Sequence, residues 1–234
     1  MYQAIRRQPT ANRLPLVIRS IRDSITWMNR TAANLAWPTR EYQAIIFDCD
    51  GTLTDSMPIH YVAWHGTMNS YGIHFPEDQF YAMGGMPSDK IIRVLASEQS
   101  IQINAEQATM EKEAAFVERL HLLEPIEAVI EVARQFRGRI PMAVASGGFR
   151  EIILLQLTQI GCHDWFQTIV TAEDTERHKP HPDVFLEAAK RMGVPPHECL
   201  VYEDSDLGLQ AARAASMDYI DVRTFYTPRR IPID

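Results

Sequence analysis

Cysteine is scarce in this chain, and the three that occur form no motif. Cys49, Cys162 and Cys199 are odd in number and scattered, without CxxC spacing. A disulfide framework is therefore not expected, and the cytoplasm, a reducing compartment, is the predicted location. The sequence also lacks any apolar run approaching the roughly 18–20 residues that span a bilayer. We therefore expect no membrane span.

Positive charge is scarce outside the first 40 residues. The formal net charge of the chain is −7. Residues 1–40 contain seven arginines and one acid, a net charge of +6, so the remainder carries −13. This balance argues against nucleic-acid binding through a bulk positive field. The basic, amphipathic extension over 1–40 has three open interpretations: a targeting peptide, a membrane-surface or partner-binding helix, or a packed appendage.

The remaining composition is that of an ordinary globular protein. Of 234 residues, 46% are hydrophobic and 23% are charged, which is enough for one good core with an insertion. There are no internal repeats and no low-complexity tract. A P-loop kinase is disfavoured because the sequence contains no GxxxxGK[ST].

From residue 41 onward, short apolar segments alternate with helical patterns. Strands are expected at 44–48, 141–145, 168–171, 199–203 and 219–222. Helices are expected between them at 149–160, 182–192 and 206–215, with Pro182 and Gly193 giving the second its Pro-first, Gly-after pattern. This alternation predicts a doubly wound, mainly parallel α/β sheet.

Residues 57–122 interrupt the alternation because they contain no convincing strand. Helices are expected near 58–71, 87–98 and 104–121, with Gly84-Gly85 between the first two. The sequence thus predicts a small helical cap domain over 57–122, inserted after the first strand of a core made of 41–56 and 123–234. Such a cap would cover the carboxyl edge of the sheet, where ligands of open α/β sheets bind.

Two aspartates end the first predicted strand, in "AIIFDCDGTLTDS" (44–56). An isolated aspartate at such a place commonly caps the next helix. At the ligand edge, however, Asp48 or Asp50 could attack an electrophile, as in enzymes that form an aspartyl-phosphate. Two carboxylates beside an anionic phosphate need nearby positive charge, which Mg²⁺ and a lysine can supply.

The other strand ends carry the parts that such a site requires. Ser146 and Gly147 follow the second strand, where a hydroxyl and an open backbone can approach a phosphate. Lys179 lies in "HKPHPDVF", and Glu203 and Asp204 follow the fourth strand. Each motif alone is weak, but four of them at successive strand ends strongly indicate catalysis.

At this point the chain resembles the haloacid dehalogenase superfamily of phosphotransferases. The motifs are "DCDGT" (48–52), "ASG" (145–147), "KPHP" (179–182) and "EDSDLG" (203–208), and the likeness covers about 42–223. The stretches 55–68 and 211–223 are similar to the branch of β-phosphoglucomutases and sugar-phosphate phosphatases. Ser216 stands where that branch usually has glycine, which we expect to affect a turn only.

The resemblance implies a Rossmann-like core and a role for each motif residue. Asp48 would be the nucleophile and an Mg²⁺ ligand. Asp50 would be the general acid and base, with its backbone carbonyl on the metal. Ser146 would hydrogen-bond the phosphoryl group and Lys179 would offset negative charge. Asp204 would complete the metal ligands, with Glu203 in direct or water-mediated support.

Further candidates lie around these motifs. Thr52 and Gly147 are candidate substrate contacts, and the resemblance suggests that His60 approaches the active site, although a helical histidine is more often a packing residue. Asp55 and Asp206 are expected to be structural or solvated. His178 and His181 flank Lys179 but lack a third ligand, so a transition-metal site is not expected there.

The substrate is expected to be a small sugar phosphate. A mutase of the resembled branch would carry an arginine in the cap loop for a second phosphate, but 86–89 reads Met-Pro-Ser-Asp, with Lys90 the nearest cation. This favours a Mg²⁺-dependent phosphatase acting on a hexose or fructose phosphate. A β-phosphoglucomutase-type enzyme, with Lys90 as substitute, is the alternative, and a non-catalytic phosphate-binding module is a third reading. The sequence does not determine the oligomeric state.

Overall fold

A five-stranded parallel sheet forms the centre of the molecule in a computed structural model that describes residues 36–229 and 231. The strand order is β3-β2-β1-β4-β5, and every neighbouring pair is parallel. The strands are β1 (Ala44–Phe47), β2 (Met142–Ala145), β3 (Thr168–Val170), β4 (Cys199–Glu203) and β5 (Asp218–Asp221). The predicted doubly wound α/β fold is confirmed, with each strand within about a residue or two of its expected bounds.

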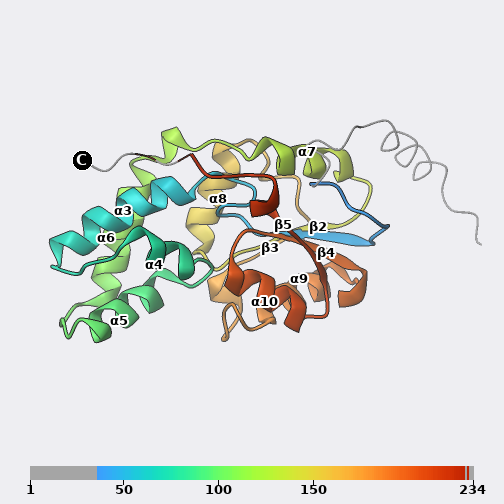
Figure 1. Ribbon diagram of the computed structural model, residues 1–234. Helices are drawn as coiled ribbons and strands as arrows, with labels where there is room; N and C mark the ends of the chain where they lie inside the picture. The colour runs from blue at the N-terminus through green and yellow to red at the C-terminus, as the bar shows by residue number, and fades with distance from the viewer. Residues whose placement is uncertain (1–35, 230, 232–234) are drawn as a thin grey trace, which may run out of the picture.

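Helices cover both faces of the sheet (Figure 1). Helices α7 (Glu127–Phe136) and α8 (Arg150–Gln159) pack on one face, and α9 (Asp183–Met192) and α10 (Asp206–Ala214) on the other. Strand β1 shows why both faces need cover: Ile45 and Phe47 belong to the first core cluster, whereas Ala44 and Ile46 belong to the second. Side chains alternate along a strand, so a wholly apolar strand must be buried on both sides.

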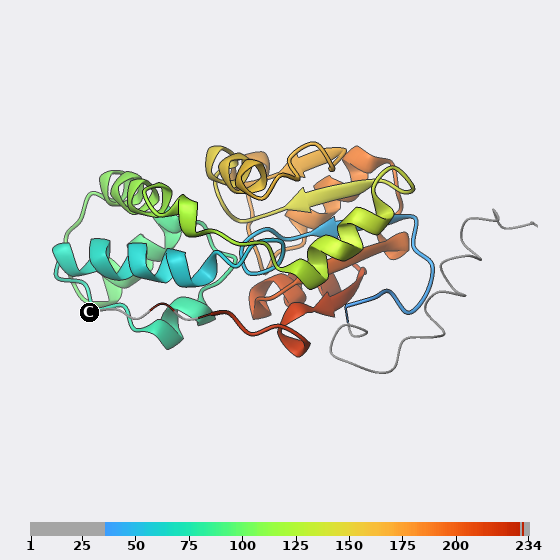
Figure 2. The same ribbon diagram turned by 90° about the horizontal axis from the view of Figure 1, so that it is seen from above.

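Four helices follow β1 and form a separate packing unit, here called the helical insertion. They are α3 (Met57–Ser70), α4 (Glu77–Ala82), α5 (Ser88–Glu98) and α6 (Ala105–Val117). Their apolar side chains form a cluster that includes Trp64, Phe80 and Leu95. The insertion lies beyond the carboxyl ends of the strands (Figure 2). The exact division at residues 57 and 122 stays a prediction.

Two helices of this fold were not predicted from the sequence. Helix α4 has only six residues, and α7 lies at 127–136, next to the predicted end of the insertion. Short 3₁₀ turns complete the connections at Leu120–Leu122, Ala172–Asp174, Pro196–Glu198 and Val222–Thr224. Most of the basic N-terminal extension (1–40) lies outside the described residues. No helix in the described part of the chain has the length and apolarity needed to cross a membrane.

Ser216, at the position where the resembled branch usually has glycine, lies in the turn after α10. Its φ is +59°, and its N–H donates to the carbonyl of Arg213 at 3.0 Å. The side chain is exposed and lies outside the residues that line the cavity described below. Serine in place of glycine at this position therefore affects a turn, as expected from the sequence.

Candidate active site

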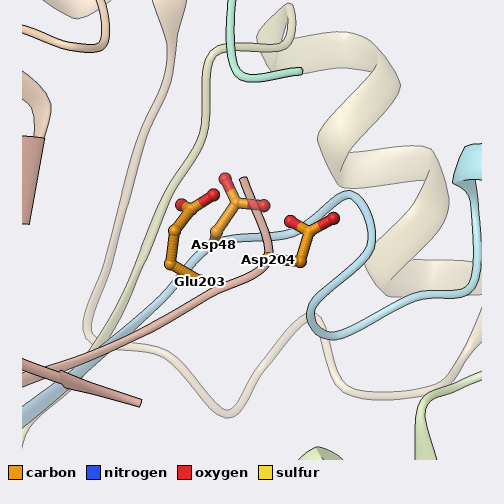
Figure 3. Close-up of side chains that lie close together, drawn as sticks. All are labelled: Asp48, Glu203 and Asp204. Carbon is orange, nitrogen blue, oxygen red and sulfur yellow. The ribbon is translucent and has the colours of Figure 1, made fainter. Parts of the chain in front are cut away.

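The loops after β1, β2 and β4 bring the predicted residues to one edge of the sheet. Asp48 follows β1, Ser146 follows β2, and Asp204 follows β4. Figure 3 shows the carboxylates of Asp48, Glu203 and Asp204 directed to the same side. Ligand oxygens of these three residues lie within 4.8 Å of one another. Parallel pairing of β1 and β4 produces this meeting, because it places Phe47 beside Tyr202 and hence both strand ends at one level.

Lys179 links the first and fourth motifs. Its Nζ donates to Oδ1 of Asp48 at 2.6 Å and to Oε2 of Glu203 at 2.7 Å, with 1% of its side chain exposed. Burial alone lowers the pKa of Lys179, but the two carboxylates outweigh burial and raise it above its ordinary value. The lysine therefore stays charged, as a buried cation with two anionic partners should.

The acidic cluster is crowded. Burial first, and then the charge of Glu203, raise the pKa of both Asp48 and Asp204 well above the ordinary value. Lys179 opposes this shift without cancelling it. The raised pKa values show that one lysine does not balance the negative charge of these buried carboxylates. A hard divalent cation, which prefers oxygen ligands, would supply the missing positive charge. The donor set therefore fits Mg²⁺.

Two glycines leave room for the carboxylates of the fourth motif. A Cβ at Gly51 would lie 2.0 Å from Oδ2 of Asp204, and φ at Gly51 is +76°. A Cβ at Gly208 would lie 2.0 Å from the carboxylate carbon of Glu203. These positions accept only hydrogen as a side chain, because real Cβ contacts are far longer. Thr52 Oγ1 donates to Asp204 at 3.4 Å, so it touches the candidate ligand from the protein side.

Glu203 is held mainly by protein donors. The backbone N–H and the hydroxyl of Ser205 donate to its Oε1 at 3.0 and 2.6 Å, and Lys179 occupies Oε2. The same serine caps α10, since its Oγ accepts from Gly208 N. Glu203 therefore orients Lys179, which in turn contacts Asp48.

Asp50 faces a different set of groups from Asp48. Its Oδ1 accepts from Ser56 Oγ at 2.6 Å, Gln156 Nε2 at 2.8 Å and His60 Nε2 at 2.9 Å. Burial alone raises the pKa of Asp50, but His60 and the hydrogen bonds outweigh it and hold this pKa below its usual range. The two aspartates of the first motif thus sit in opposite electrostatic environments, which suits two different roles.

A buried polar chain connects Asp50 to the helical insertion. His60 lies in α3, and its Nδ1 is 3.0 Å from Nζ of Lys112 in α6. An ammonium group can only donate, so Nδ1 accepts this hydrogen bond. Nε2 then carries the hydrogen that it donates to Asp50 in the other hydrogen bond. Lys112 also donates to Glu113 at 3.1 Å, and Ser88 donates to the same carboxylate at 2.6 Å. The His60 ring stacks on Phe116 with centroids 3.8 Å apart.

Sequence reasoning missed Lys112, Glu113, Ser88, Ser56 and Gln156. One signal was available for Lys112. The buried positions of α6 include 105, 108, 109, 112 and 116, a helical stripe that is otherwise alanine, threonine and phenylalanine. A lysine on such a stripe indicates a buried partner for its charge.

Three of the four motifs line one cavity beneath the insertion, and Lys179 of the remaining motif is buried next to it. The cavity lining includes most of the predicted site residues: Asp48, Asp50, His60, Ser146, Gly147, Glu203 and Asp204. The insertion contributes Trp64, Phe80, Met86, Ser88, Lys112 and Glu113, among others. Lys90 is exposed and is not among the lining residues, whereas Lys179 is buried beneath Asp48.

The insertion touches the core directly beside the second motif. A Cβ on Gly147 would lie 2.3 Å from the carbonyl oxygen of Gly85, and one on Gly85 would lie 3.2 Å from Oγ of Ser205. Gly148 N donates to Ser146 Oγ at 3.0 Å, which shapes the same loop. The insertion and the core therefore meet at the second motif.

A parallel α/β core with four motif loops and a helical insertion defines a class of hydrolases. The model of the haloacid dehalogenase-like hydrolase family matches residues 45–222, and the chain belongs to that family. The sequence is 38% identical over 184 residues to the fructose-1-phosphate phosphatase YqaB of Escherichia coli, covering 78% of this chain and 97% of that protein.

More distant relatives agree with this assignment. A phosphorylated carbohydrates phosphatase of Thermotoga maritima is 27% identical over 182 residues, covering 76% of this chain and 83% of that protein. The crystal structure of a hydrolase from Pseudomonas syringae is similar with a TM-score of 0.69 at 27% identity, covering 76% and 83%.

Proposed function

We propose that this protein is a Mg²⁺-dependent phosphatase that hydrolyses a small sugar phosphate through an aspartyl-phosphate. The observation that supports this best is the pairing of Asp48 with Lys179 at 2.6 Å, beside Asp204 and at the base of a cavity. A buried lysine that neutralises a strand-end carboxylate is expected where that carboxylate must meet an anionic phosphate. The phosphatases among its relatives support the same conclusion.

The site residues divide the reaction between them. An oxygen of Asp48 forms a bond to phosphorus, the bond from phosphorus to the sugar oxygen breaks, and Asp50 gives that oxygen a proton. Asp50 then takes a proton from water, whose oxygen attacks the aspartyl-phosphate and releases inorganic phosphate and free Asp48. Ser146 and the backbone at Gly147 hold the phosphoryl oxygens, and Lys179 offsets their charge.

Asp48, Asp204 and the backbone carbonyl of Asp50 would hold the magnesium ion, with Glu203 in support. The bound ion would neutralise the charge of the phosphoryl group and of the acidic cluster. Thr52 keeps the Asp204 carboxylate in place, since its hydroxyl donates to that group.

A hydrolase fits the cavity better than a mutase does. A mutase must bind a second phosphate, and so needs a free cation on the insertion side. Among the described residues, the insertion contributes one lysine, Lys112, to the cavity lining. The carboxylate of Glu113 lies 3.1 Å from its Nζ and neutralises its charge. Lys90 is exposed and outside that lining. We therefore propose that the leaving group is an uncharged polyol or sugar.

A panel of sugar phosphates with Mg²⁺ tests this function. The expected result is release of inorganic phosphate from fructose or hexose monophosphates, abolished in Asp48→Asn while the far-UV spectrum is unchanged. Isomerised sugar phosphate without phosphate release would instead identify a mutase. Neither product, together with binding of a phosphate analogue, would point to the non-catalytic module.

The cytoplasm is the proposed location. All three cysteines are buried and free, a state that fits a reducing compartment. The proposed partner is the small phosphorylated substrate itself, and the acidic charge of the chain gives no support for nucleic acid.

A further inference from the structure

We infer that Gln156 is a positioning residue that fixes the carboxyl group of Asp50 so that Oδ2 is the oxygen that exchanges protons with the substrate. The inference rests on the proposed function, because it concerns the proton donor of that reaction. It is carried by the contacts of one fully buried side chain on α8.

Gln156 is an unusual residue for its place in the helix. Its neighbours on the buried face of α8 are Ile152, Ile153 and Leu157, and Gln156 itself has 0% of its surface exposed. A buried amide without partners is costly, so all of its polar atoms need hydrogen bonds. Burying it inside an otherwise apolar stripe indicates that these bonds have a purpose beyond packing.

The amide orientation of Gln156 follows from its surroundings. Its Oε1 accepts from Thr54 Oγ1 at 2.7 Å and is 3.9 Å from the Cys49 thiol. A carboxylate oxygen can only accept, so the amide nitrogen must face Oδ1 of Asp50 and the amide oxygen must face Thr54 and Cys49. Nε2 then donates to Oδ1 of Asp50 at 2.8 Å.

The three donors to Asp50 come from two sides. Ser56 immediately precedes α3 and His60 lies about one turn further along that helix, whereas Gln156 reaches the carboxylate from α8. The carboxylate is therefore clamped between two elements. Without Gln156 both remaining donors belong to one side, and the carboxylate can rotate about its Cβ–Cγ bond.

This clamp distinguishes the two oxygens of Asp50. Oδ1 accepts all three hydrogen bonds, whereas Oδ2 accepts none from the residues at 36–229. The Asp50 side chain is 21% exposed and lines the cavity. A proton on Asp50 must therefore sit on Oδ2, because the lone pairs of Oδ1 are occupied. From Oδ2 it passes to the leaving oxygen as the phosphorus–oxygen bond breaks.

Leaving-group dependence separates positioning from simple support of the fold. A sugar alkoxide needs a proton to leave, whereas p-nitrophenolate leaves without one. The parameter to compare is kcat/KM, because it includes only steps up to release of the alcohol and so excludes the later water step. We expect Gln156→Met to lower kcat/KM by about 10–100-fold for fructose 1-phosphate and by less than about threefold for p-nitrophenyl phosphate.

Gln159→Met is the matched control. It makes the same substitution on the exposed side of the same helix, and both substrates should keep their wild-type kcat/KM. Should Gln156→Met fail to fold, Thr54→Val replaces it. This variant removes the hydroxyl that orients the amide, and it should again affect the sugar phosphate more than the aryl phosphate.

Equal losses on the two substrates, or no loss on either, would overturn the inference. A wild-type protein inactive on both substrates would refute the proposed function instead, so the two failures are distinguishable.

Discussion

At the scale of single residues, Lys179 shows how the site balances buried charges of opposite sign. Its Nζ lies 2.6 Å from Asp48 and 2.7 Å from Glu203, in a position closed to solvent. Such a triad is stable only while it is complete, because each member balances a buried charge of the others. The sequence motif places a lysine near this edge, but its exact partners depend on how the 171–182 loop returns across the sheet.

Lys179→Met should therefore damage stability as well as activity. With the ammonium gone, Asp48 and Glu203 face each other unpaired, and the free energy of unfolding should fall by about 3–5 kcal/mol. Adding Glu203→Gln should restore part of this loss without restoring activity, because the phosphoryl group still lacks its cation. Urea unfolding in the presence of a chelator measures both variants. A double variant no more stable than Lys179→Met would contradict the triad.

At the scale of elements, the loop before α5 and the loop after β2 form the contact between the insertion and the core. This contact has no room for a side chain at Gly147, whose Cβ would lie 2.3 Å from the carbonyl oxygen of Gly85. The sequence marks both sites with paired glycines, Gly84-Gly85 and Gly147-Gly148. The contact between the two glycine pairs is set by the tertiary structure, because it depends on the direction in which α3 leads the chain into the insertion.

Gly147→Ala should separate the insertion from the core. We expect kcat/KM for the sugar phosphate to fall by about tenfold or more, because separated loops would admit more water and misplace the second motif, while Tm changes little. Gly66→Ala is the matched control. Gly66 is exposed within α3 and a Cβ there meets nothing within 4 Å. That variant should keep full activity and gain about 0.5–1 kcal/mol of stability. Full activity in Gly147→Ala would show that the loops need not touch.

At the scale of the whole molecule, metal binding should couple to folding. The protein carries a formal net charge of −7 and gathers three carboxylates at one buried place. Their burial and, after it, their mutual repulsion cost stability in the metal-free protein, as the raised pKa values of Asp48 and Asp204 indicate. An ion that binds only the folded state adds stability, about 2.7 kcal/mol at 100 times its Kd.

Asp204→Asn should therefore change Tm in opposite directions with and without Mg²⁺. In a chelator the variant should melt above wild type, because one buried charge has gone. With excess Mg²⁺ it should melt below wild type, because the ligand has gone too, and the wild-type shift on adding Mg²⁺ should be lost. Asp206→Asn, an exposed neighbour paired with Arg223, serves as control and should keep the shift. A persistent shift in Asp204→Asn would place the metal elsewhere.

The sequence by itself determined the sheet and its functional edge. Apolar strands such as 44–47 must be buried on both faces, and parallel strands end at one edge, so residues placed after the strands had to meet there. Only the tertiary structure decided what surrounds them. Gln156 and Lys112 reach Asp50 and His60 across more than 50 residues of sequence. The packing of α8 and α6 sets these contacts, and no local pattern encodes the distance between two helices.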